Sequence, residues 1–450
     1  MIKMCNQYVS NKTVLLVLLE QAEIALCSSA AAWLRFGQIR FLLPRLALTG
    51  AIVQLCLYCM DLYAFRPAPR PRRLALNLAQ ALAVASLALA AVYFALPSVY
   101  IGRGVFAMTL LFVFVVLFGA RLALGQVLSS RTPEQCAVIG TGPLARALEQ
   151  ELRSRPDLNC QVVMHPDPRP IFGSGRPLSK IFIDSDDQDM PMREFLELKI
   201  HGVHFENVQS ALASLTGRIW LGYSSPSWLV FAAGFQRSKL SAALKRGLDL
   251  ALAALSGLVA APLMLAIAAA IKIDSKGPVF YRQARVGLDG RIFHLIKFRS
   301  MRHHAGLSSA PQWACEGDPR ITRVGRFLRR LRLDELPQCL NILAGQMSFV
   351  GPRPEQPEFV DILKRDSAHY HQRHSVRPGL TGWAQINYPY AASIDDSYRK
   401  LEYDLFYLKN MSFLFDIVII LKTIHAVTAG AGNGSVANAG EATHVAVGSR

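Results

Sequence analysis

Long apolar stretches near the N-terminus constrain the fold of this 450-residue chain more than any other feature, and three of them cover about residues 41–64, 74–97 and 104–126. A helix of about 20 apolar residues crosses the roughly 30 Å hydrocarbon core of a bilayer. Each stretch is therefore predicted to span a membrane. Residues 14–33 form a weaker fourth span, because Glu20 and Glu23 lie inside it and acids are costly in lipid. A cleaved signal peptide is the alternative interpretation of residues 14–33.

The charge distribution gives these spans an orientation. The segment 66–73, between the second and third spans, carries four arginines, and such basic loops stay on the cytoplasmic side. Four spans would then leave the N-terminus and everything after residue 131 in the cytoplasm. The net charge of +17 suits anionic lipid, phosphate substrates or nucleic acid, and does not by itself choose among them.

Residues 131–240 have the composition of a soluble α/β domain. Strands are predicted near 136–139, 161–164 and 180–184, with a helix over 144–152. The turn Gly140-Thr141-Gly142 resembles a glycine-rich turn that brings backbone amides close to a pyrophosphate. No acidic residue clearly ends a second strand, as a dinucleotide site would require. We therefore interpret this segment as a Rossmann-like domain kept for structure or regulation. The tail 431–450 is predicted to be disordered.

A later apolar run, residues 250–271, is long enough to be a fifth span, but its flanks argue against crossing. Lys245 and Arg246 precede it and Lys272 and Lys276 follow it, so both ends carry the cytoplasmic charge signature. Pro262 lies in the middle, where it removes a backbone donor and bends a helix. The sequence therefore predicts a hairpin-like re-entrant helix with Pro262 as its hinge.

A cationic segment precedes the residues with the most chemical promise. Residues 319–333 contain six arginines and no acid, with apolar residues at helical spacing, which predicts a basic amphipathic helix at a lipid surface. Sparse aromatic residues and the neighbouring spans argue against a nucleic acid partner. Asp334 and Glu335 follow, and Asp334 is predicted to be an N-cap with Pro337 in the first turn. The arginines and the helix dipole should keep the Asp334 carboxylate ionised and able to attack.

Several irregular motifs surround this acidic pair in a fixed order. Together they resemble those of the bacterial sugar transferase family, the monotopic polyprenyl-phosphate phosphoglycosyl transferases, over about residues 240–428. The four spans and Rossmann-like domain resemble long-form members that start exopolysaccharide or O-antigen synthesis. At residue 261, however, an alanine stands where well-known members have serine before the hinge proline. The motifs occupy residues 282–287, 297–301 (Lys-Phe-Arg-Ser-Met), 317–320 (Gly-Asp-Pro-Arg), 351–354 (Gly-Pro-Arg-Pro) and 377–387.

The resemblance implies a two-step transfer at the inner membrane, with the active site facing the cytoplasm. Asp334 would attack the sugar-bearing phosphorus of a UDP-sugar and release UMP, and undecaprenyl phosphate would then take the sugar phosphate. Glu335, with Asp334, would hold Mg²⁺. The residues that would bind the substrates are Arg353, Arg329, Lys297 and Arg299. A homodimer is compatible with a long-form member.

The predicted fold class is membrane α-helical plus α/β, in four parts: a membrane domain (1–130), a Rossmann-like cytoplasmic domain (131–240), a mainly α catalytic domain (241–430) and a tail (431–450). One rival is a glycosyltransferase that releases UDP; another is a non-enzymatic membrane scaffold or nucleotide sensor that uses the 131–240 domain. Several other residues are expected to have structural or solvent-exposed positions rather than a role in the reaction. Trp383 should pack or anchor, Asp416 should be a structural charge, and five histidines should be solvated rather than metal ligands: His303, His304, His369, His371 and His374.

Overall fold

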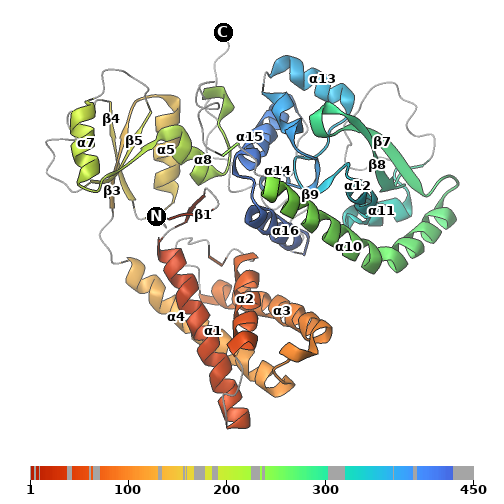
Figure 1. The fold of residues 1–450 in the computed structure, drawn as a ribbon, viewed down its shortest axis with the longest axis horizontal. Helices are drawn as coiled ribbons and strands as arrows, with labels where there is room; N and C mark the ends of the chain where they lie inside the picture. Colours follow the sequence, from red (N-terminus) through yellow and green to blue (C-terminus); the bar gives the residue numbers. More distant parts are fainter. Residues whose placement is uncertain are drawn as a thin grey trace. The chain divides into compact units, whose positions relative to one another are not determined.

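The structure of the chain is a computed structural model, shown in Figure 1, which describes residues 2–4, 7–9, 11–37, 43–59, 62–63, 71–129, 134–155, 158, 160–166, 178–184, 191–223, 234–235, 239–302, 320–367, 369–388 and 393–428. The chain divides into two compact units, Met1–Gly217 and Arg218–Arg450. The predicted tail 431–450, His303 and His304 lie outside the described residues.

The first unit opens with a short hairpin of β1 (Ile2–Met4) and β2 (Gln7–Val9), followed by four apolar helices: α1 (Asn11–Phe36), α2 (Leu43–Cys59), α3 (Pro71–Ala95) and α4 (Arg103–Ser129). Segments of α1, α3 and α4 are long and apolar enough to cross a bilayer. The predicted span 41–64 corresponds to α2, whose described helix is shorter at 17 residues. Apolar side chains from all four helices form one core, with Ile24, Leu57, Leu78 and Leu117 fully buried.

An ion pair inside this helical core explains why α1 tolerates an acid. Glu20 of α1 receives two hydrogen bonds from Arg121 of α4, Nε to Oε1 at 2.6 Å and Nη2 to Oε2 at 3.1 Å. Arg121 also donates to the carbonyl oxygen of Leu62 at 2.7 Å and lies over the ring of Tyr63. A paired charge costs far less to bury than a lone one. One of the two acids that weaken residues 14–33 as a predicted span, Glu20, therefore binds α1 to α4.

The α/β part of the first unit holds a four-stranded parallel sheet in the order β4-β3-β5-β6. The three predicted strands are confirmed, and β6 and two further helices are added. Its core contains Ala137, Ile139, Ile181, Phe195 and Val203. The elements are β3 (Glu134–Ile139), α5 (Pro143–Ser154), β4 (Cys160–His165), β5 (Leu178–Ile183), α7 (Met192–Ile200), β6 (His204–Asn207) and α8 (Val208–Thr216).

An acid does follow one strand of this sheet, but that strand is β5, the third of the domain along the chain rather than the second. Asp184 comes directly after β5 and donates its backbone N–H to the carbonyl oxygen of Ile139 at 3.0 Å. Its carboxylate accepts backbone hydrogen bonds from Gly142 and Ala145 at the start of α5. A Cβ built on Gly140, whose φ is +125°, would lie 2.6 Å from the Cβ of Asp184. The side chain of this protein's own acid thus lies against the glycine-rich turn.

The second unit is built around α10 (Lys239–Asp274), a 36-residue helix that contains Pro262 and that Figure 1 shows bent along its course. By length and composition α10 could also span a membrane, so its re-entrant course stays a prediction. Many of its apolar side chains are exposed, among them Leu255, Leu258, Val259 and Leu265. Ala253 and Ile267 instead join two separate cores of the unit.

The remaining elements of the second unit surround the predicted site. An antiparallel hairpin of β7 (Phe280–Val286) and β8 (Ile292–Phe298) is followed by α11 (Arg323–Arg330) and α12 (Gln338–Leu343). The short strands β9 (Ser348–Val350) and β10 (Gly379–Thr381) pair in parallel. Four more helices lie in the described part of this unit: α13 (Pro357–Asp366), α14 (Trp383–Asn387), α15 (Ile394–Asn410) and α16 (Phe413–Thr428).

Candidate active site

The acidic pair lies in a tight turn between two short helices. The predicted basic helix is confirmed only over α11, which Thr322 caps by accepting a hydrogen bond from the backbone N–H of Gly325 at 2.9 Å. Arg332 then adopts a left-handed conformation, with φ 56° and ψ 21°, which ends the helical path. The prediction that Asp334 is an N-cap is wrong, because Asp334 lies inside a 3-10 helix, Leu333–Glu335, and Pro337 occupies the cap of α12.

Glu335 is the anionic centre of the site. Its Oε1 accepts a hydrogen bond from Arg353 Nη2 at 2.6 Å and one from Lys297 Nζ at 3.2 Å. The three residues come from the 3-10 helix, from the Gly-Pro-Arg-Pro turn after β9 and from β8. Burial alone would raise the pKa of Glu335, but Arg353 and Lys297 outweigh it and hold this pKa well below its ordinary value. Three of the predicted site residues are therefore in direct contact, around a carboxylate that stays ionised.

Asp334 has a different electrostatic environment from its neighbour. Burial raises the pKa of its carboxyl, the Glu335 charge adds to that rise, and Lys297 and Arg329 oppose it. Burial and the adjacent carboxylate thus outweigh the nearby cations in setting the direction of this shift, and the ionised state of Asp334 stays a prediction. A desolvated carboxylate is a better nucleophile than a hydrated one. The pair thus divides into one carboxylate held by two cations and one whose charged form burial disfavours.

Two motifs that are distant in sequence meet backbone to backbone beside this pair. Gly351 donates its N–H to the carbonyl oxygen of Thr381 at 2.9 Å, and Gly379 donates to that of Pro352 at 2.9 Å. A Cβ on Gly351 would lie 2.5 Å from the carbonyl oxygen of Arg377, so this close approach requires glycine. The Gly-Pro-Arg-Pro turn is consequently fixed by the 377–382 motif, and the position of Arg353 is fixed with it.

A buried ion pair behind the turn also fixes Arg353. Arg373 Nη2 donates to the carbonyl oxygen of Arg353 at 2.9 Å, lies 2.8 Å from Asp404 Oδ2, and Arg373 Nη1 donates to the Tyr370 hydroxyl at 2.6 Å. Arg373 and Asp404 are 6% and 2% exposed, so neither charge is hydrated to any extent. We did not predict either residue as part of the site, because a pair 31 positions apart leaves no spacing signal.

A second ion pair holds the other end of the turn. Arg285 of β7 donates to the carbonyl oxygen of Pro354 at 2.9 Å and pairs with Glu355 at 3.3 Å. Burial lowers the pKa of Arg285, and Glu355 partly opposes this change. Because Arg285 and Lys297 both belong to the β7–β8 hairpin, the hairpin sets the position of the turn relative to the acidic pair.

The other two predicted substrate-binding residues behave differently from each other. Arg329 of α11 lowers the pKa of Asp334 through its charge, and its Nε donates to Ser300 Oγ at 2.9 Å. Arg299 does not join the Glu335 cluster. Its guanidinium donates to the carbonyl oxygens of Ser275 at 2.7 Å and Lys276 at 2.9 Å, at the C-terminal end of α10. Cations stabilise helix C-termini in this way, so Arg299 has a structural role there.

The donor set suits a magnesium ion that arrives with phosphate oxygens. No group of three or more His, Cys, Asp or Glu side chains in the described part of the chain could enclose a metal ion. Mg²⁺ usually keeps several waters and binds one or two carboxylates together with substrate phosphates. Asp334 and Glu335 supply two adjacent carboxylates, so these residues fit such an ion. Magnesium at this site stays a prediction.

Several expectations for the surrounding residues can be compared with the structure. His374 is buried at 8% exposure, which contradicts a solvated position, and burial lowers its pKa to about 3. His371 is exposed, as expected. Trp383 packs against Phe406 and Phe415, which confirms a packing role. Asp416 is a structural charge, paired with Lys245 at 2.7 Å and bonded to the Tyr407 hydroxyl.

An acidic pair of intermediate exposure, with Lys297 and Arg353 bonded to one of its carboxylates, is the kind of charged arrangement that phosphoryl transfer uses. Comparison with known proteins assigns the family. The model of the bacterial sugar transferases matches residues 240–430, the segment that contains every contact of the Glu335 cluster. A relative from Rhizobium leguminosarum bv. phaseoli, an exopolysaccharide production protein, is 40% identical over 187 residues, which is 40% of this chain and 93% of that protein. The chain belongs to the bacterial sugar transferase family.

Longer relatives carry more specific names. A UDP-N-acetylgalactosamine-undecaprenyl-phosphate N-acetylgalactosaminephosphotransferase from Aeromonas hydrophila is 43% identical over 226 residues, or 50% of this chain and 52% of that protein. A UDP-glucose:undecaprenyl-phosphate glucose-1-phosphate transferase from Xanthomonas campestris pv. campestris is 49% identical over 176 residues, or 39% of this chain and 36% of that protein. The chain thus matches about half or less of the length of these two relatives.

Proposed function

We propose that this protein is a membrane enzyme that transfers a sugar-1-phosphate from a UDP-sugar to undecaprenyl phosphate, with release of UMP, as the first step of exopolysaccharide synthesis. The observation that carries the proposal is the position of Asp334 next to Glu335. The Oε1 atom of Glu335 lies 3.2 Å from Lys297 Nζ and 2.6 Å from Arg353 Nη2. The names of the long relatives support the substrates. The apolar helices support a place in the bacterial inner membrane, with the site facing the cytoplasm.

In the first step, Asp334 attacks the phosphorus that bears the sugar. A bond forms between the carboxylate oxygen and phosphorus, the phosphorus–oxygen bond to UMP breaks, and UMP leaves with its bonding electrons. Arg353 and Lys297 are placed to neutralise the diphosphate charge, which is the main contribution a protein makes to phosphoryl transfer. Burial of Asp334 favours attack because the carboxylate sheds less water on reaching phosphorus.

In the second step, a phosphate oxygen of undecaprenyl phosphate attacks the same phosphorus. The bond from Asp334 to phosphorus breaks, the carboxylate returns, and the product is the lipid diphosphate sugar. Arg329, whose charge acts on Asp334, is placed to attract the acceptor phosphate. Asp334 and Glu335 would hold Mg²⁺, which would supply charge neutralisation on the diphosphate when bound.

The scaffold or nucleotide-sensor alternative depends on the glycine-rich turn of the 131–240 segment. The carboxylate of Asp184 accepts hydrogen bonds from the backbone amides of Gly142 and Ala145, and a bound pyrophosphate would need these same amides. An anionic ligand would have to displace this carboxylate and then remain beside it. We therefore favour the enzyme, and keep a structural role for the Rossmann-like domain.

The nucleotide product tests the proposal. The full chain in nanodiscs would be incubated with Mg²⁺, undecaprenyl phosphate and either UDP-glucose or UDP-N-acetylgalactosamine. We expect UMP, a loss of at least about a thousandfold in Asp334→Asn, and wild-type rates in Asp361→Asn, a matched control on the exposed face of α13. Chelation with EDTA should stop release, and added Mg²⁺ should restore it. Release of UDP would instead identify a glycosyltransferase.

A further inference from the structure

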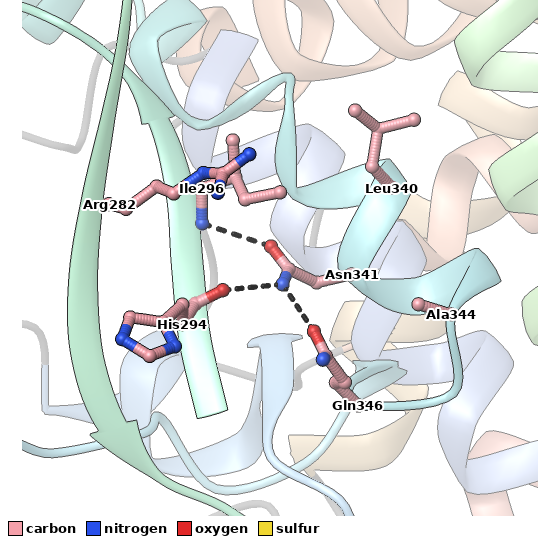
Figure 2. A pocket seen from close by; sticks show the side chains of 7 residues that line it. All are labelled: Arg282, His294, Ile296, Leu340, Asn341, Ala344 and Gln346. Carbon is pink, nitrogen blue, oxygen red and sulfur yellow. Dashed lines mark hydrogen bonds between the residues drawn. The ribbon is translucent and has the colours of Figure 1, made fainter. Parts of the chain in front are cut away.

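A pocket of about 530 Å³ opens between the β7–β8 hairpin and α12, as Figure 2 shows. Arg282 and His294 border it from the hairpin, and Leu340 and Ala344 border it from the helix. Asn341 lies between them. Its Oδ1 accepts the backbone N–H of Ile296 at 3.0 Å, and its Nδ2 donates to the carbonyl oxygen of His294 at 2.8 Å. The side-chain amide therefore hydrogen-bonds the backbone of β8 at two residues and connects α12 to the hairpin.

The pocket lies on the opposite face of the hairpin from the reaction centre. In the register of the two strands, Arg282 is opposite Ile296, and Tyr281 is opposite Lys297. Successive side chains of a strand point to opposite faces. Lys297 contacts Glu335, so the face with Arg282, His294 and Ile296 is turned away from the acidic pair. A molecule bound in the pocket would not present its phosphate to Asp334.

The polar groups that remain available in the pocket are cationic or hydrogen-bond donors. Arg282 is exposed, and no carboxylate occurs among the described residues that line the pocket. The His294 side chain is exposed on the same face of the hairpin. A guanidinium binds a phosphate through two parallel hydrogen bonds, and an imidazole can add a third. The absence of an acid at this lining would leave the amine of a zwitterionic headgroup unpaired, which favours a headgroup with net negative charge.

The apolar wall of the pocket suits the acyl chain of a lipid. Leu340 lines the pocket and is 46% exposed, and Leu343, outside the lining but on the same short helix, is 41% exposed although α12 packs on α10. A Cβ built on Gly257 of α10 would lie only 3.7 Å from Cys339 Sγ of α12, which places the two helices in close contact at the apolar stretch of α10. An acyl chain could therefore lie along α12 toward the surface where α10 is expected to enter the bilayer.

We propose that this pocket binds the headgroup phosphate of an anionic glycerophospholipid, such as phosphatidylglycerol, with Arg282 and His294 as its ligands and with the acyl chain against Leu340 and Ala344. The site is separate from that of the undecaprenyl phosphate acceptor. Such a lipid would hold α12, and so the turn that begins it, at a fixed depth in the membrane interface. The inference goes beyond the proposed activity and does not depend on it.

Native mass spectrometry of the full chain in detergent, titrated with phosphatidylglycerol or phosphatidylcholine, tests the site. We expect preferential binding of phosphatidylglycerol, and a loss of at least about fivefold in the affinity for it in Arg282→Gln/His294→Gln. Ala344→Trp should also displace the lipid, because its side chain fills the pocket without changing any charge. Arg365→Gln, which removes an exposed arginine on α13, is the control and should bind as wild type.

Two outcomes would overturn the proposal. If the double variant and Ala344→Trp, with unfolding temperatures like wild type, keep the full preference for phosphatidylglycerol, the pocket does not bind it. If they instead lose affinity for undecaprenyl phosphate alone, the pocket belongs to the acceptor. Because binding is measured without a UDP-sugar, a failure here is distinguishable from a failure of the proposed transfer reaction.

Discussion

Substitution of Arg373 by methionine should damage both stability and activity, for separable reasons. The variant leaves Asp404, at 2% exposure, without its partner, and removes the bonds to Tyr370 and to the Arg353 carbonyl oxygen. Removing one member of a buried ion pair costs about 3–5 kcal/mol. At about 2–4 °C per kcal/mol for a unit of this size, the unfolding temperature of the detergent-solubilised chain should fall by about 6–20 °C.

A double variant separates the two effects. Arg373→Met/Asp404→Leu replaces the pair by apolar side chains of similar size, which is often close to neutral for stability. Its unfolding temperature should therefore return most of the way to wild type. Release of UMP should stay low, because the carbonyl oxygen of Arg353 still lacks its donor and the Arg353 guanidinium is no longer fixed against Glu335.

Scanning fluorimetry and UMP release, measured on both variants, would decide the question, with Arg365→Met on the exposed face of α13 as the control. The reasoning is refuted if Arg373→Met unfolds within about 2 °C of wild type. It is also refuted if the double variant recovers full activity, because the Arg373 contact would then not position Arg353.

Three further variants test other parts of the structure. Arg121→Met should destabilise the helical unit by about 3–5 kcal/mol, since it leaves Glu20 unpaired at 1% exposure, and a normal melting profile would show that the pair contributes nothing. Gly140→Ala should lower the yield of folded protein, because its Cβ would lie 2.6 Å from that of Asp184 at a φ of +125°; Gly119→Ala, with nothing within 4 Å, is the control. His374 has a folded-state pKa of about 3, below its unfolded value, so its contribution to stability is complete above about pH 6.5 and declines as the pH falls. From pH 7.5 to 5.5, wild type should lose about 1.4 kcal/mol more than His374→Asn in unfolding experiments, and equal losses would contradict the buried neutral imidazole.

The sequence predicted the elements whose signals are local. Apolar length identified the helices of the first unit, and alternation of short strands with a helix identified the parallel sheet. The motifs likewise led to Lys297, Glu335 and Arg353, which the structure brings into contact. The sequence could not predict ion pairs between residues that are far apart along the chain. Glu20 looks costly until Arg121, 101 residues later, is seen beside it.

Local rules also failed where tertiary structure overrode them. Asp334 resembles an N-cap, but the left-handed Arg332 turns the chain into a 3-10 helix instead. Burial, which no local pattern reports, raises the pKa of Asp334 even though Lys297 and Arg329 lower it. Arg299 carries a motif position yet bonds the end of α10, and Asp184 fills a glycine-rich turn that appears open in the sequence.

The central claim is that Asp334 carries the sugar phosphate, and a single-turnover experiment without acceptor tests it most directly. Full-length protein in nanodiscs would be mixed with Mg²⁺ and a UDP-sugar, quenched, digested and analysed by mass spectrometry. The account predicts one UMP per active enzyme, with a hexose phosphate added to the peptide that contains Asp334 and lost when undecaprenyl phosphate is supplied. UMP that appears only when the acceptor is present, with no modified peptide at any time, would contradict the account and indicate direct transfer between the two substrates.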